Sequence, residues 1–119
     1  MAAASITAII PPRDTATSLW AMTTVDAALV STGAKILYPK DGRMVIVITN
    51  TAGATKDIVI AAGNGLHAGM GAVTRNLAAT TGSSVIGPLS SSRFKDSNGY
   101  INISFGSGMT GQIAAIRLP

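Results

Sequence analysis

Short segments of the chain alternate apolar and polar residues with a period of two, as half-buried β-strands do. The clearest is Tyr100–Phe105, where Ile101, Ile103 and Phe105 fall on one face. Val, Ile and Thr are frequent in such segments, and Gly, Ser, Asn and Pro separate them. Strands are predicted at 34–38, 44–50, 57–62, 83–86, 100–105 and 112–118, with weaker candidates at 5–10 and 73–78. This pattern predicts an all-β fold, a β-sandwich of the jelly-roll or Ig-like type.

Two of these segments, 44–48 and 58–60, are apolar at both parities, meaning that the residues on both faces of the strand are apolar. Such runs are typical of central strands covered on both faces, or of strands buried at a subunit contact. The polar connector 51–56 has the length of a hairpin loop, so the two strands are expected to pair with each other.

The residues before Ala34 differ in composition, because Pro11 and Pro12 interrupt a short apolar run and Ser, Thr and Ala then dominate. We predict an extended N-terminal arm at 1–33 and a sandwich domain at 34–119. Within the arm, 24–30 fits either a short helix with Thr24 as its N-cap or a strand. An arm of this kind can add a strand to the sheet edge of a neighbouring molecule, or fold back over its own sandwich. In the first case its large apolar residues would be the interface anchors: Ile6, Ile9, Ile10, Leu19 and Trp20.

Composition narrows the possible functions. The chain has 119 residues and a net charge of +4, with no Cys, and all five of its acidic residues are Asp. One domain is expected at this length. The lack of Cys excludes disulfide scaffolds and cysteine nucleophiles, and the lack of Glu argues against most acid/base enzymes. The longest bulky apolar run, 44–48, is far shorter than the roughly 20 residues of a membrane-spanning helix. The N-terminus lacks the pattern of a signal peptide, so synthesis in the cytoplasm is expected.

No motif in the sequence indicates a cofactor, a metal site or a catalytic residue. Residues 63–68 match the loose dinucleotide pattern G-x-G-x-x-G/A, but Gly69 and Gly71 weaken any helix that would follow. The next acid is Asp96, too far along the chain to contact a ribose. His67 is the single histidine and cannot assemble a typical zinc site. A small hydrolase using His67 in a Ser–His–Asp arrangement stays open, because Ser and Asp are present and the geometry is not encoded in spacing.

Composition also bears on two binding functions. The basic residues are dispersed and aromatics are few, so nucleic-acid binding is not expected. A carbohydrate-binding module would need exposed rings, for which Trp20, Tyr38 and Tyr100 are the candidates.

The segments 85–94 (VIGPLSSSRF) and 113–119 (IAAIRLP) resemble those of small β-sandwich proteins that decorate, or cement, the capsids of tailed bacteriophages. The resemblance covers 34–119. It implies a non-enzymatic virion protein that binds the outer face of the major capsid protein lattice, often as a homotrimer, and clamps neighbouring capsomers. It also implies a location on the capsid surface. A tail or fibre component would share this composition and is the alternative within the particle.

Overall fold

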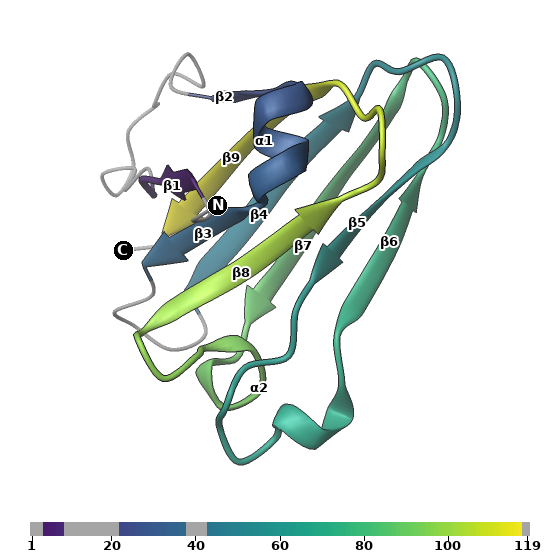
Figure 1. Ribbon diagram of the computed structural model, residues 1–119. Coiled ribbons are helices and arrows are strands. Elements are labelled where there is room, and N and C mark those ends of the chain that lie inside the picture. Colours follow the sequence, from purple (N-terminus) through teal and green to yellow (C-terminus); the bar gives the residue numbers. More distant parts are fainter. Residues whose placement is uncertain (1–3, 9–21, 38–42, 118–119) are drawn as a thin grey trace, which may run out of the picture.

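Two β-sheets face each other in the computed structural model, which describes residues 4–8, 22–37 and 43–117 (Figure 1). The five-stranded sheet has the order β1-β3-β8-β5-β6, from strands β1 (Ala4–Ile6), β3 (Ala34–Leu37), β8 (Tyr100–Phe105), β5 (Lys56–Ile60) and β6 (Val73–Leu77). The four-stranded sheet has the order β2-β9-β4-β7, from β2 (Thr23–Val25), β9 (Gly111–Arg117), β4 (Met44–Asn50) and β7 (Gly82–Leu89). Three short helices complete the described parts of the chain: α1 (Ala27–Thr32), η1 (Ala68–Met70) and α2 (Ser91–Phe94). The predicted β-sandwich is therefore confirmed.

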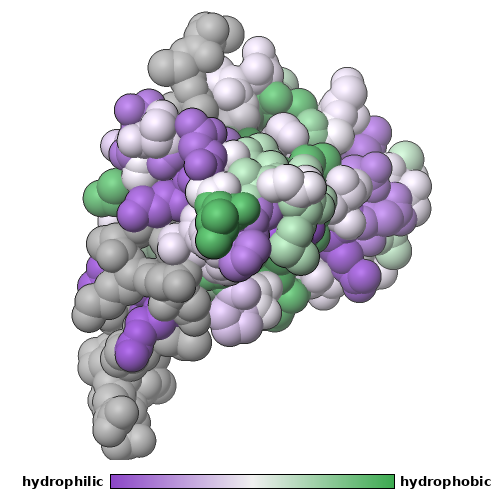
Figure 2. Space-filling model, turned by 90° about the horizontal axis from the view of Figure 1, so that it is seen from below, coloured by the Kyte–Doolittle hydropathy of each residue, from purple (hydrophilic) through white to green (hydrophobic). Residues whose placement is uncertain are grey.

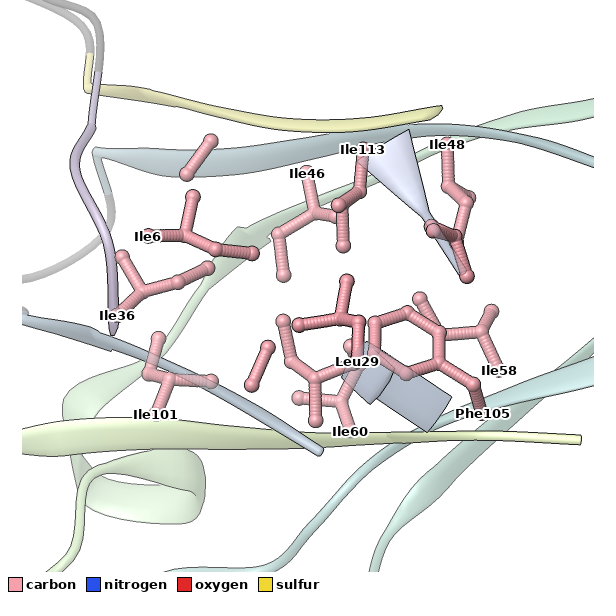
Figure 3. Close-up of a cluster of buried hydrophobic side chains, with 14 of the residues drawn as sticks. Ile6, Leu29, Ile36, Ile46, Ile48, Ile58, Ile60, Ile101, Phe105 and Ile113 are labelled. Carbon is pink, nitrogen blue, oxygen red and sulfur yellow. The ribbon is translucent and has the colours of Figure 1, made fainter. Parts of the chain in front are cut away.

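The core lies between the two sheets and consists largely of isoleucine. Side chains of one parity in each strand point inward, so that Ile46, Ile48 and Ile113 of one sheet meet Ile58, Ile60 and Phe105 of the other (Figure 3). The inward residues of β4 are fully buried, and the residues between them are half-buried. Such interdigitation of two inner faces is the general basis of sandwich stability.

The structure corrects the expected pairing of the two strands that are apolar at both parities. β4 lies in the four-stranded sheet between β9 and β7, whereas β5 lies in the other sheet between β8 and β6. The connector between them is a crossing from one sheet to the other and not a hairpin. Apolar residues at both parities of β4 therefore do not mean that both of its faces are in the core.

The described parts of 1–33 belong to the sandwich and do not extend away from it. β1 pairs in parallel with β3, and β2 pairs antiparallel with β9. Ile6, Val25 and Leu29 are buried in the common core. Burial within the same chain does not carry the entropy cost of association, which explains why these residues cover their own sandwich.

The segment for which helix and strand were both open contains one of each. β2 ends at Val25 and α1 begins after Asp26, whose side-chain Oδ1 accepts a hydrogen bond from the Leu29 N–H at 2.9 Å. The N-cap is thus Asp26 and not the predicted Thr24, because Thr24 still pairs with Gln112 in the sheet.

A buried amide fixes the end of the sandwich at which the chain crosses between the sheets. Asn50, at the end of β4, is fully buried, and its Nδ2 donates to the carbonyl oxygens of Ala54, Leu77 and Ala78 at 3.2, 3.3 and 3.0 Å. Its Oδ1 accepts from the Ala52 N–H at 3.0 Å. One side chain thereby joins the β4–β5 crossing to the β6–β7 crossing, and every polar atom of its amide is satisfied.

Replacement of Asn50 by Asp should destabilise the fold by about 3 kcal/mol or more, because a carboxylate would face the carbonyl oxygens with no hydrogen to donate. Urea unfolding monitored by circular dichroism measures the loss. Asn64→Asp is the matched control, since Asn64 is exposed, and should change the free energy of unfolding by less than about 0.5 kcal/mol. An Asn50→Asp protein as stable as the control would contradict the role given to this amide.

A second polar side chain organises the turn that leads into β8. Asp96 Oδ1 accepts hydrogen bonds from the N–H groups of Asn98 and Tyr100, both at 2.9 Å, and its Oδ2 accepts from Asn102 Nδ2 at 2.7 Å. The Tyr100 N–H, followed by the Asn102 amide, holds the pKa of Asp96 below its ordinary value. The ionised carboxylate therefore stabilises the native turn.

Asp96→Asn should lower the free energy of unfolding at neutral pH, because it retains one acceptor oxygen but removes the charge. A carboxyl with a depressed native pKa contributes stability above its unfolded pKa of about 4 and loses that contribution as the pH falls through the native pKa. The difference between the variant and the wild type should accordingly shrink below about pH 4. Urea unfolding across the acid range tests this, and a difference independent of pH would refute it.

Candidate functional site

The outer face of the five-stranded sheet is mostly polar. By the register of the paired strands, its outward residues are Ser5, Lys35, Leu37, Asp57, Val59, Thr74, Asn76, Tyr100, Asn102 and Ser104. Leu37, at the end of β3, is an exposed apolar residue among them. Many of these side chains are engaged with each other: Asn76 donates to Asp57 at 2.7 Å, and the Lys35 ammonium lies 4.7 Å from the centre of the Tyr100 ring. This face has the character of an ordinary solvated surface. The ring of Tyr100, one of the candidates for sugar stacking, is in contact with the Lys35 ammonium group.

The outer face of the four-stranded sheet is different, because an apolar area occupies much of it. Val47 lies between Val85 of β7 and Ala114 of β9, and Val45 lies beside Ile116. We call these five residues the apolar face. Val85 is 68% exposed, and Val45, Val47 and Ile116 are half-buried. Ala114 is buried, yet it does not belong to the core cluster between the sheets.

A polar row borders the apolar face on the same side of the sheet. It crosses the four strands as Thr24, Gln112, Thr49 and Ser83. The Gln112 N–H donates to Thr49 Oγ1 at 3.0 Å, so this row is fixed by hydrogen bonds to the backbone. No charged residue occupies an outward position within either the row or the apolar face. An uncharged apolar area with a polar border is typical of protein interaction sites.

The glycine-rich loop packs on α2, which explains its resemblance to a dinucleotide motif. The N–H of Gly63 donates to the Arg93 carbonyl at 2.8 Å, and Arg93 Nε donates to the Gly71 carbonyl at 3.0 Å. A Cβ atom on Gly63 or Gly65 would overlap the backbone of Lys95 or Ser92. The two glycines are thus required for close approach between backbone segments.

Figure 2 views the molecule from below and shows hydrophobic residues interspersed with hydrophilic ones on that side.

Gly63→Ala should lower the melting temperature and destabilise the fold by about 2 kcal/mol, because its methyl group must displace backbone. Gly69→Ala is the matched control in the same loop, since a Cβ there meets nothing within 4 Å, and it should leave stability unchanged or slightly higher. Thermal unfolding of both variants compares them. Equal melting temperatures would show that the glycines are not there for packing.

His67 is the residue on which the hydrolase alternative depended. Its Nδ1 lies 2.8 Å from Ser92 Oγ, which in turn lies 2.7 Å from Ser90 Oγ. The three aspartates in the described ranges bond elsewhere: Asp26 caps α1, Asp57 accepts from Asn76, and Asp96 holds its turn. The structure therefore brings a serine to His67 but, within those ranges, no carboxylate to orient the imidazole. No cluster of described residues has the composition to hold a metal ion.

The predicted interface anchors do not form a site in the described parts of the chain. Ile6 is 5% exposed and packs in the core of its own sandwich, which corrects its expected role as an intermolecular anchor. Ile9, Ile10, Leu19 and Trp20 lie outside the described residues, as does Tyr38. The apolar face was not identified from the sequence. The available signal was the double-parity run at 44–48, for which a subunit contact was one of two interpretations.

Comparison with known proteins finds no significant match to a family model, a curated protein or a solved structure. Of the helices in the described ranges, none combines the length and the apolar character needed to cross a membrane.

Proposed function

We propose that this protein is a non-enzymatic structural protein of a phage particle, and that it decorates the head by docking its apolar face on the major capsid protein. The observation that carries the proposal is the contrast between the two outer faces of the sandwich. One face is mostly polar, with Leu37 and Val59 as separate apolar residues, whereas Val45, Val47, Val85 and Ile116 form a continuous uncharged apolar area on the other. A partner that covered this area would remove β-branched side chains from water.

The resemblance of 85–94 and 113–119 to capsid decoration proteins supports the choice of partner. Both segments contain strand residues of the four-stranded sheet, in β7 and β9, and the apolar face lies on the outer side of this same sheet. The same surface and composition would serve a tail or fibre component, which differs only in where it binds on the particle. Docking needs no cofactor and no titrating group.

Such docking would stabilise the shell by mass action. A ligand that binds the assembled lattice but not its separated subunits adds about 2.7 kcal/mol per site at a hundredfold excess over Kd. Because a capsid offers many equivalent sites, the contribution is repeated over the whole shell. Heat resistance of the particle is therefore the expected physiological effect.

Val47→Lys should weaken binding to phage particles that lack the protein by about tenfold or more, because it places a charge in the centre of the apolar face. Cosedimentation with such particles, together with their survival on heating, measures the effect. The matched control is Thr74→Lys, an exposed outward position of the five-stranded sheet, which should bind and protect like the wild type. Melting temperatures verify that both variants are folded.

Two results would count against the proposal. If Val47→Lys binds and protects particles as well as Thr74→Lys does, the apolar face is not the docking surface. If the wild-type protein itself does not sediment with particles, head decoration fails, and a tail component or a carbohydrate-binding module becomes the better hypothesis.

A further inference from the structure

The four edges of the two sheets differ in how well they are protected against pairing. β1 and β2 are edge strands of only three residues each. β6 has five residues, of which Thr74, Arg75 and Asn76 are exposed, with the arginine at the centre. Short length and a charged centre are both common means by which proteins prevent edge-to-edge association.

The edge formed by β7 has neither protection over most of its length. β7 has eight residues and, in the described parts of the chain, pairs only with β4. No residue of β7 is charged. Pro88 and the register shift opposite Met44–Ile46 interrupt the ladder at the far end only. The stretch from Gly82 to Ile86 is therefore an uncharged edge whose alternate backbone groups point away from β4.

We propose that β7 pairs antiparallel with β7 of a second copy of this chain, about a two-fold axis through Val85. In that register the two Val85 side chains lie opposite each other on the outer side of the sheet, and Ser84 of each copy faces Ile86 of the other. The regular ladder thus joins residues 84–86 of the two copies, while Ser83 and Gly82 face Gly87 and Pro88 at the irregular end of the strand. The four-stranded sheets of the two copies join into one continuous sheet. A strand that pairs with itself about a two-fold axis forms an isologous interface, which closes after two copies.

The apolar face argues for a second copy as the occupant of this edge. Val85 ends the row that runs through Val47 to Ala114, so the two-fold pairing continues this row from one copy into the other. A valine opposite a valine is a favourable cross-strand pair. Although each chain carries +4, β7 itself contains no charged residue that would repel its counterpart. This pairing does not depend on the partner that the apolar face binds. It predicts a dimer, whereas the resemblance to decoration proteins implies a trimer.

The natural absence of cysteine allows a direct test by cross-linking. In Val85→Cys the two sulfur atoms would lie in directly opposed positions, where Cα atoms about 4.5–5.5 Å apart fit disulfide geometry. Mild oxidation should give a covalent dimer of twice 12.0 kDa in most of the protein. Asn76→Cys, exposed on the β6 edge, is the matched control and should stay monomeric on a non-reducing gel.

Sedimentation velocity of the protein without cross-linking provides the second readout. The wild-type protein at about 0.1 mM, a concentration that populates even a weak complex, should sediment as a dimer. Val85→Lys should sediment as a monomer with an unchanged melting temperature, because two ammonium groups would be opposed at an exposed position.

The proposal is overturned if Val85→Cys cross-links no better than Asn76→Cys. It is equally overturned if the wild-type mass is that of a monomer or a trimer, or if Val85→Lys leaves a dimer intact. None of these measurements uses phage particles, so failure of the dimer and failure of capsid docking are distinguished.

Discussion

The buried amide of Asn50 holds together the end of the sandwich at which the chain twice crosses between the sheets. Its hydrogen bonds join the β4–β5 crossing to Leu77 and Ala78, where β6 ends and the chain turns toward β7. A further backbone bond, from the Thr80 N–H to the Ala52 carbonyl at 2.8 Å, ties the same two crossings. These contacts lie at the two places where the chain changes sheet, so that β4 and β7 share one sheet while β5 and β6 share the other. The two layers, and therefore the two outer faces, follow from that assignment.

The separation of the layers gives the protein its asymmetry. Because β4 and β5 lie in different sheets, the apolar residues that point away from the core lie on opposite outer faces of the sandwich: Val45 and Val47 on one, and Val59 on the other. On the five-stranded sheet Val59 is surrounded by polar neighbours, whereas on the four-stranded sheet Val45 and Val47 join apolar residues of β7 and β9. A face of this kind is costly to leave in water and is suited to binding. The proposed docking surface and the proposed β7 pairing both rest on this single consequence of the topology.

The glycine-rich loop illustrates how one pattern can serve different physical needs. Glycines let a backbone approach another group closely, and the group can be a phosphate or a neighbouring peptide. Here Gly63 and Gly65 lie against the backbone of 92–95, so the motif-like spacing reflects packing. Similarly, the hydrogen bond between the side chains of His67 and Ser92 joins the same two segments. The sequence showed only that this loop is rich in glycine, and the structure gives the reason: close packing against residues 92–95.

Local chemistry determined the strands, because alternation with a period of two and turn residues such as those at 96–99 act within a few positions of the chain. The ranges 44–50 and 100–105 were predicted with the bounds that the structure has. The sequence could not determine which strands pair, because pairing joins residues far apart and depends on how the crossings are anchored. For the same reason it could not show that Ile6 belongs to the core or that Val85 lies on an edge strand of the described four-stranded sheet. Those positions were decided by the tertiary structure. Alternate residues of each strand point into the core, and the topology determines which outer surface the remaining residues form.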